Sequence, residues 1–216
     1  MPRRSRKETQ AHTRACLLEA AAKVFTRRGL ERASVEEVSE EAGFTKGAFY
    51  ANFKSKQELF LAMLDERFAA KLERLEADLA GEDDDPGEEA RRAAEDIALH
   101  SDPEWAKLFF EFTAYAAKDE DFRQEFATRY RALQERMTEI IRRWSADFPE
   151  PPLSLEDITL MTCCMANGFM MEKLIEPELP EELSGMMQLV FFRGLQALSV
   201  GWEPPTRSEV ALGRRS

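Results

Sequence analysis

The stretch of sequence that decides the fold is Gly43-Phe44-Thr45-Lys46-Gly47-Ala48-Phe49-Tyr50-Ala51-Asn52-Phe53-Lys54-Ser55-Lys56. It holds three lysines and a tyrosine hydroxyl, and no acidic residue occurs from position 43 through position 57. Its pattern predicts a short helix that begins near Thr45, and Ser55 with Glu58 predicts a capping box at the start of a longer helix. A basic stretch free of acidic residues indicates a partner that carries phosphate.

The charge of the whole chain sets this stretch apart. The 216 residues have a formal net charge of −11. Residues 1–56 hold twelve Lys and Arg and seven Asp and Glu, a net charge of +5, whereas residues 57–216 hold eighteen and thirty-four, a net charge of −16. Such segregation lets one end of an acidic protein approach nucleic acid and discourages contact through the other end.

The residues before this stretch predict two further helices. A first helix ending at Gly29 is indicated by apolar residues at spacings of three and four, namely Leu17, Ala21, Val24 and Phe25. Ser34 and Glu37 predict a capping box that opens a second, short helix. Gly43 is expected to end that helix as a C-terminal cap.

The residues after the stretch also follow helical spacing. The fourth helix has its apolar residues at Leu59, Phe60, Met63, Leu64, Phe68, Leu72, Leu75 and Leu79. A loop is predicted at 81–87, followed by helices near 88–100, 103–117, 120–147, 154–176 and 180–199. The chain is therefore predicted to be all-α with about nine helices. Its expected division is a three-helix unit with a basic arm at 1–56, a larger helical domain at 57–200 and a disordered tail at 201–216.

The second and third predicted helices, with a glycine-containing turn between them, form a helix-turn-helix. In this motif the second helix lies in the major groove of DNA, with its N-terminal residues nearest the base edges. Here those residues are Lys46, Gly47 and Ala48, and the two small residues let the backbone approach the groove closely. Tyr50, one turn later, is expected to point outward, whereas Phe49 is expected to pack inward.

The stretch resembles the DNA-binding unit of the TetR family of bacterial transcriptional regulators. The resemblance covers roughly residues 12–64 and rests on Gly43-Phe44-Thr45-Lys46-Gly47-Ala48-Phe49-Tyr50-x-x-Phe53-x-Ser55-Lys56-x-x-Leu59, preceded by Ser34-Val35-Glu36-Glu37-Val38. Beyond these residues the likeness is to an architecture, a larger helical domain that dimerises. Many members have histidine after the tyrosine, where this chain has Ala51, and Asn52 stands where a second aromatic residue is common.

The resemblance implies a set of contacts with double-stranded DNA. Ser34, Thr45 and Tyr50 are expected to contact phosphates, and Lys56 is expected to meet the DNA backbone across the groove. Lys46 and Gly47 are expected to lie closest to the bases. The remaining predicted DNA-binding residues are Ala48, Asn52 and Lys54.

A competing interpretation is a compact three-helix unit whose basic face is merely solvated. The basic residues at the N-terminus also have two interpretations. They fit an arm in the minor groove of DNA or a disordered tail attracted without specificity. These residues are Arg3, Arg4, Arg6 and Lys7.

Aromatic residues crowd the middle of the chain, where most are expected to form ordinary core. The three phenylalanines between positions 109 and 112 cannot all face one direction on a single helix, so at least one faces a second apolar environment. We expect a mostly apolar pocket for a small-molecule effector, as in the family, with Glu111, Thr113 or Tyr115 as its polar groups. The predicted lining residues are Phe68, Trp105, Phe109, Phe112, Thr113, Phe126, Tyr130, Met165 and Phe169.

The last two predicted helices are apolar on more than one face, so they need cover on more than one side. A four-helix contact between two subunits, as in the family, supplies this cover. Two DNA-binding units, one helical turn of DNA or a multiple apart, then read a pseudo-palindromic operator. The predicted dimer-interface residues are Met161, Met170, Leu174, Met187, Val190, Phe191 and Leu195.

Other classes of protein and site find little support. Only two histidines occur, and no phosphate-cradling glycine loop, nucleophile motif or metal-ligand spacing is present, so we expect no enzyme activity, cofactor or metal. No apolar run is long enough to span a membrane and no secretory signal is apparent, so a cytoplasmic protein is expected. Cys163 and Cys164 are expected to be small buried residues, because neighbours on a helix do not face each other as a redox pair would.

The sequence therefore predicts a homodimeric transcriptional repressor that a small apolar or amphipathic ligand releases from its operator. An alternative is a DNA-binding activator or architectural protein that has no small ligand and is controlled by protein partners. A third interpretation is a helical-bundle enzyme with a vestigial DNA-binding unit.

Overall fold

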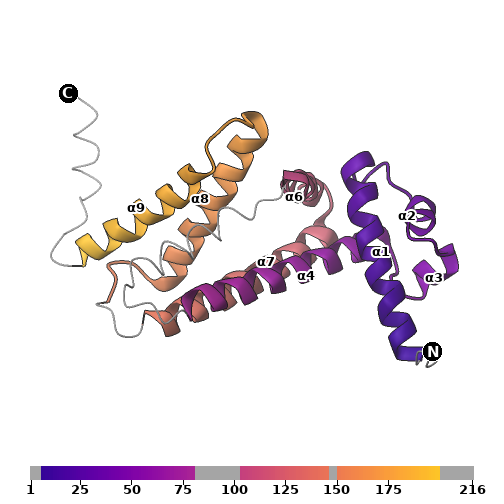
Figure 1. Cartoon of the computed structure of the whole chain (residues 1–216), viewed down its shortest axis with the longest axis horizontal. Coiled ribbons are helices and arrows are strands. Elements are labelled where there is room, and N and C mark those ends of the chain that lie inside the picture. The colour runs from indigo at the N-terminus through magenta and orange to yellow at the C-terminus, as the bar shows by residue number, and fades with distance from the viewer. Residues whose placement is uncertain (1–5, 81–102, 146–149, 200–216) are drawn as a thin grey trace.

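This computed structural model describes residues 6–80, 103–145 and 150–199. These residues form eight helices joined by turns and loops, and they contain no strand. The helices are α1 (Arg6–Arg28), α2 (Val35–Glu41), α3 (Lys46–Tyr50), α4 (Lys56–Leu79), α6 (Pro103–Ala116), α7 (Glu120–Trp144), α8 (Leu155–Ile175) and α9 (Glu182–Leu198) (Figure 1). The prediction of an all-α chain is confirmed.

Several predicted segments lie outside the described residues. These are the loop at 81–87, the helix near 88–100 and the tail at 201–216. Of the basic N-terminal residues, Arg3 and Arg4 also lie outside them, whereas Arg6 and Lys7 form the start of α1.

Hydrogen bonds between residues close in sequence set the ends of the first helices. Ser34 Oγ accepts from the Glu37 N–H at 3.1 Å, and the Ser34 N–H donates to Glu37 Oε2 at 3.0 Å, so the predicted capping box of α2 is confirmed. Gly29 follows α1 and Gly43 follows α2, with φ angles of +74° and +73°. Glycine adopts this left-handed conformation without steric cost, which allows the chain to turn sharply after each helix.

The start of α4 differs from the predicted capping box in one bond. Ser55 Oγ accepts from the Glu58 N–H at 3.1 Å, as expected. The Glu58 carboxylate, however, accepts from the Lys54 N–H at 2.6 Å. In a capping box this carboxylate would accept from the N–H of the capping residue, Ser55. Here it accepts from the residue before the cap and still satisfies a backbone donor ahead of the helix.

We refer to α1–α3 as the head and to α4–α9 as the body. One continuous hydrophobic cluster joins them. Phe112 of α6 is fully buried and stacks on Phe60 of α4, and its ring centroid lies 5.9 Å from that of Phe25 in α1 and 6.1 Å from that of Phe122 in α7. This cluster contains residues from both sides of the predicted boundary after residue 56.

Polar contacts from α6 and the residues just after it also join the body to the head. Leu30 lies just after the end of α1, and its N–H donates to Glu111 Oε1 of α6 at 2.5 Å. A Cβ at the preceding Gly29 would lie 2.5 Å from the same carboxylate oxygen, so this close approach requires glycine. Lys118, just after α6, pairs with Glu31 at 3.6 Å. The position of α6 is thereby tied to the end of α1.

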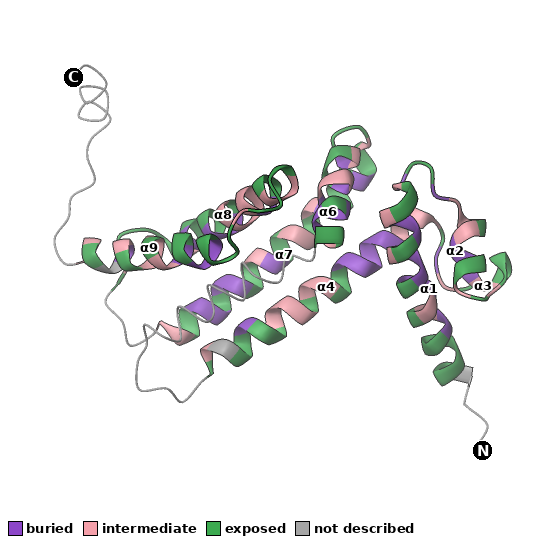
Figure 2. Cartoon of the chain, turned by 45° about the horizontal axis from the view of Figure 1, so that its top comes forward, coloured by how far each residue is buried: buried purple, intermediate pink, exposed green. Residues whose placement is uncertain are grey.

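The body is built on α4 and α7, which run side by side away from the head (Figure 1). In Figure 2 the buried part of α4 lies mainly near the head, whereas buried residues recur along α7. Toward the far end, a second hydrophobic cluster fills the space between α4, α7 and α8 with Leu75, Leu133, Met137, Ile140 and Cys163. α8 packs on α6 and α7, and α9 packs on α8, so the last two helices form a hairpin on the outside of the body.

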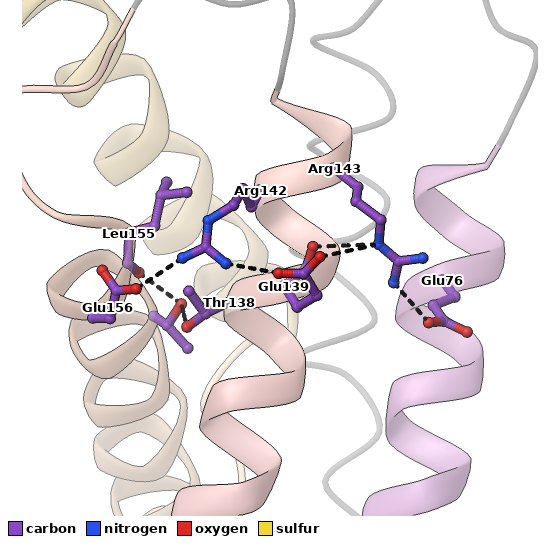
Figure 3. A network of polar contacts seen from close by, with 8 residues as sticks. Glu76, Thr138, Glu139, Arg142, Arg143, Leu155 and Glu156 are labelled. Atoms are coloured by element: carbon purple, nitrogen blue, oxygen red, sulfur yellow. Dashed lines mark hydrogen bonds and ion pairs between the residues drawn. The ribbon is translucent and has the colours of Figure 1, made fainter.

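Polar contacts hold α7 between α4 and α8 (Figure 3). Arg143 of α7 donates to Glu76 of α4 at 3.2 Å, an exposed pair that contributes little to stability by itself. On the other side of α7, the buried hydroxyls of Thr138 and Thr159 form a hydrogen bond of 2.8 Å. Because both hydroxyls have partners, this polar contact sets the register of α7 against α8 without an unsatisfied group.

Candidate nucleic-acid interface

The turn between α2 and α3 places the first residues of α3 at the surface of the head. Thr45 caps this helix, since its Oγ1 accepts from the Ala48 N–H at 3.2 Å. Lys46 and Gly47 are exposed, and Ala48 is half-buried. The N–H groups of Ala48 and Phe49 both donate to Thr45 within the helix, so the exposed Lys46 and Gly47 are the surface that the start of α3 offers to another molecule.

The aromatic residues of this region divide into buried and exposed, as predicted. Phe49 is fully buried and Phe53 is buried beneath Arg14, whose guanidinium carbon lies 4.4 Å from the ring centroid. Tyr50 is 53% exposed, with its ring edge-on to Phe49 at a centroid distance of 5.5 Å. The packing of the phenylalanines orients the exposed face of α3, on which Tyr50 lies.

The fold itself does not require glycine at position 47. A Cβ added to Gly47 would meet nothing closer than Thr45 Oγ1 at 3.7 Å, an ordinary van der Waals distance, and Gly47 has no left-handed φ. Gly29 and Gly43, by contrast, are needed for their backbone conformations. A glycine that the free protein does not need, at the exposed start of α3, favours close approach of another molecule to the backbone.

Lys46 has a partner that the sequence did not predict. Its ammonium forms an ion pair with Glu36 of α2, and both side chains are about half exposed, 51% for Lys46 and 52% for Glu36. The hydrogen bond between them lowers the pKa of Glu36 and raises the pKa of Lys46, so both groups stay charged near neutral pH. The only sequence signal was the abundance of glutamate in α2, whose sequence is VEEVSEE.

Three other predicted DNA-binding residues lie on or beside this face. Ser34 is half-buried, and its hydroxyl is engaged in the cap of α2. Asn52 Nδ2 donates to the Ala48 carbonyl at 2.8 Å, which orients the amide just after α3. Lys54 is exposed, and its backbone N–H donates to Glu58. Contact with DNA by these residues stays a prediction.

The Lys56 side chain has a structural role that the sequence did not indicate. Its Nζ donates to the carbonyls of Leu30, Glu31 and Ala33 at 2.6, 3.1 and 3.0 Å. An ammonium has three N–H donors, and these three bonds use all of them. A phosphate contact from this side chain would break bonds that hold the loop between α1 and α2, so we assign the Lys56 ammonium to the head–body contact.

The residues predicted to line an effector pocket are distributed over several environments. Phe109, Phe112 and Phe126 are buried in the first cluster, and Phe68 and Trp105 pack against it. Met165 and Phe169 are half-buried on α8, and Thr113 is exposed, with its hydroxyl donating to the Phe109 carbonyl at 2.8 Å.

Tyr130 is the predicted pocket residue with the most polar surroundings. Its hydroxyl accepts from Asn167 Nδ2 of α8 at 2.7 Å, and burial raises its pKa. The other polar groups proposed for the pocket face elsewhere, because Glu111 bonds Leu30 and Tyr115 bonds Gln57 and Asp119.

An open groove of about 390 Å³ lies between α1, α4 and α6, and Trp105 is the one predicted pocket residue among those that line it. Leu18, Ala22, Met63 and Leu108 supply apolar surface, and Arg67 lies over the Trp105 ring at 5.3 Å. This groove is at the junction of head and body, and apart from Trp105 it is lined by residues that were not predicted for the pocket.

The predicted dimer-interface residues lie on the outer hairpin. Met161, Met187 and Val190 are exposed, at 42%, 42% and 68%. Leu174 and Phe191 are half-buried, whereas Met170 and Leu195 are buried within the chain and offer little surface to a partner. Further large apolar side chains of α8 and α9 are exposed beside them: Leu160, Met171, Ile175, Leu183 and Met186. Most exposed large apolar residues of the described chain thus belong to this hairpin.

Cys163 is buried, and burial raises the pKa of its thiol, but Cys164 is exposed. The expectation that both would be buried is therefore wrong for Cys164, because adjacent helical residues point about 100° apart. Within the described ranges, no group of three or more His, Cys, Asp or Glu is placed to hold a metal ion. No helix of the described chain has the length and apolarity to cross a bilayer.

Comparisons with known proteins bear on both parts of the chain. Residues 17–63 match the bacterial regulatory proteins of the tetR family, and residues 97–187 match the C-terminal part of BetI-type transcriptional repressors. The HTH-type transcriptional regulator YfiR of Bacillus subtilis is 26% identical over 193 residues, which cover 84% of this chain and 90% of that protein. The regulator TtgR of Pseudomonas putida is 45% identical over 65 residues, 30% of each chain.

Solved structures agree with this assignment at the level of the fold. The transcriptional regulator FadR of Bacillus subtilis, in complex with stearoyl-CoA, superposes with a TM-score of 0.65 at 16% identity, covering 87% of this chain and 97% of that one. The two sequence matches together span more than half of the 216 residues and include the helix-turn-helix. This chain belongs to the TetR family of DNA-binding transcriptional regulators.

Proposed function

We propose that this protein is a homodimeric repressor that reads a pseudo-palindromic operator with two α3 helices and leaves it when a small ligand binds the body. The observation that carries the DNA-reading part is the exposed start of α3, where Lys46 stands beside Gly47, a glycine that the fold does not need. A helix of this kind enters the major groove with its N-terminal residues toward the base edges.

We assign the DNA contacts of the head residues from their exposure and their position on or after α3. We assign Lys46 and Gly47 to base contacts because both are exposed at the start of α3, and we assign the exposed Tyr50 to a phosphate contact through its hydroxyl. Lys54 adds an exposed positive charge after α3. We exclude the Lys56 ammonium from this set, because it already bonds three carbonyls.

Replacing Lys46 with alanine is expected to weaken operator binding by about 30-fold or more, since a good base contact contributes about 1–3 kcal/mol and a dimer loses two. Tyr50→Phe, which removes only a hydroxyl, is expected to cost about tenfold. Fluorescence anisotropy with a duplex selected by the wild-type protein from random-sequence DNA measures both effects. Lys107→Ala, an exposed lysine of α6, is the matched control and should bind as the wild type does. Full affinity in both head variants would show that α3 is not the reading helix.

A dimer accounts for the apolar outer face of the α8–α9 hairpin. A large contiguous patch of exposed apolar side chains commonly marks a surface that binds another molecule. A second copy of the hairpin, packed face to face, would form a four-helix contact and bury exposed residues such as Met186 and Val190. Two heads are also needed for selectivity, because one short helix contacts too few base pairs.

The ligand response is proposed from the position of α6. One side of this helix carries Phe109, whose ring lies 5.8 Å from Phe126 and 6.1 Å from Tyr130 in the predicted pocket region. Another side carries Glu111, which bonds the Leu30 N–H in the head. A ligand that moves α6 would therefore move the end of α1, and with it the head.

The FadR neighbour that holds stearoyl-CoA supports an amphipathic ligand with a long apolar part, so stearoyl-CoA is the first probe. We expect it to raise the melting temperature and to weaken operator binding by about five- to a hundredfold, a coupling of about 1–3 kcal/mol. Coenzyme A without the acyl chain is the control and should do neither. If no acylated or aromatic compound of a broad panel shifts the melting temperature, the result favours the alternative of a DNA-binding protein that has no small ligand.

A further inference from the structure

We propose that Glu36 determines DNA specificity together with Lys46: its carboxylate accepts a hydrogen bond from an exocyclic amino group of a base, beside the base acceptor that Lys46 contacts. This inference rests on the proposed function, because it assumes that the start of α3 enters the major groove. It adds a residue of α2 to the reading surface and a chemical class of target, an amino group adjoining an acceptor.

The acidic residues of α2 do not all face the same way. The helix has four glutamates in seven residues, at positions 36, 37, 40 and 41. Glu37 and Glu41 turn back toward α1, where they pair with Arg28 at 2.9 Å and Arg27 at 3.1 Å. Glu36 instead reaches across the turn to Lys46, the first residue of α3. It is therefore the acidic side chain bound to the residue that is expected to read bases.

The pair is accessible to another molecule. About half of each side chain is exposed, and Lys46 is paired through Oε1, so Oε2 of Glu36 is the second acceptor of the carboxylate. An exposed ion pair of this kind stabilises the fold little. Breaking it therefore costs little free energy, and both side chains can form contacts with another molecule. The two side chains together present a donor and an acceptor next to each other.

Base edges offer the complementary arrangement. In the major groove, guanine O6 lies beside the N4 amino group of its paired cytosine, and adenine N7 lies beside its own N6 amino group. A lysine donor beside a glutamate acceptor matches either edge. Phosphates and bases without an amino group offer acceptors alone, which suit Lys46 but repel Glu36.

This repulsion creates a difference in affinity between sites. At the operator both members of the pair find partners. On other DNA, Lys46 has to leave Glu36, and the carboxylate remains close to negative charge. Discrimination depends on such unfavourable contacts at wrong sites as much as on favourable contacts at the right one.

The test compares Glu36→Ala with Glu40→Ala, which removes the same charge from the same helix. Glu40 is exposed and has no ion pair among the described residues, so it controls for general electrostatics. The probes are the duplex selected by the wild-type protein from random-sequence DNA and a scrambled duplex of equal length. Glu36→Ala should bind the scrambled duplex more tightly and the selected duplex no more tightly, lowering the ratio of affinities about tenfold or more. Glu40→Ala should change both affinities by one common factor.

Selection repeated with Glu36→Ala identifies the base. We expect one symmetric position in each half-site to lose its preference, and the base lost there distinguishes cytosine from adenine. In a Lys46→Met background, Glu36→Ala should have a much smaller effect, because the two side chains act as one unit. Because both glutamates are exposed, we expect Glu36→Ala and Glu40→Ala to have the melting temperature of the wild type. Equal melting temperatures show that the substitutions leave folding unchanged.

Two outcomes separate failure of this inference from failure of the proposed function. If Glu36→Ala and Glu40→Ala act alike and select the same sequence as the wild type, Glu36 contributes only charge, while reading by α3 stands. If the wild-type protein selects no sequence, or Lys46→Met binds the selected duplex as the wild type does, the proposed function itself fails.

Discussion

Replacing Val190 with aspartate is expected to dissociate the dimer and to weaken operator binding at least a hundredfold. Val190 is 68% exposed on α9, so the isolated chain should tolerate the new carboxylate. In the proposed four-helix contact, both copies would bury that charge without a partner. The cost of a buried unpaired charge is about several kcal/mol, which amounts to a factor of at least a hundred in the dimer equilibrium.

Sedimentation velocity and anisotropy with the selected operator duplex measure the two effects together. Thr128→Asp is the matched control, because it also puts a carboxylate in place of an exposed β-branched residue, on α7. That variant should remain dimeric and bind the operator as the wild type does. A Val190→Asp protein with the wild-type dimer affinity would show that the outer hairpin is not the subunit contact.

Replacing Phe112 with alanine is expected to lower the free energy of unfolding by about 3–5 kcal/mol, the range for a fully buried aromatic residue. The reason is its position among Phe25 of the head, Phe60 of α4 and Phe122 of α7. Truncation removes contacts with three helices at once and leaves a cavity at the junction. The neighbouring residues cannot close that cavity without moving the head relative to the body.

Urea unfolding at one fixed protein concentration measures this loss, since the stability of a dimer depends on concentration. Thr113→Ala, the next residue on the same helix, is exposed and should change stability by about 0.5 kcal/mol or less. A loss below about 1 kcal/mol in Phe112→Ala would mean that this ring is not part of a shared core.

The helix-turn-helix could be predicted from the sequence because its boundaries depend on short-range bonds. The cap of α2 joins Ser34 to Glu37, and the cap of α3 joins Thr45 to Ala48, three residues apart in each case. The inward packing of Phe49 followed from helical spacing for the same reason. Interactions within one turn are encoded by residue type and spacing, and these suffice to recognise the family.

The roles of the charged residues were decided by tertiary structure alone. Lys56 bonds carbonyls 23 to 26 residues earlier, Glu111 bonds a backbone N–H 81 residues away, and Lys46 pairs with Glu36 on a different helix. A lysine in a basic stretch has the same sequence pattern whether its ammonium meets a phosphate, a loop carbonyl or a carboxylate. The choice depends on which acceptor the folded chain brings within about 3 Å, and that distance is a property of the packing of helices.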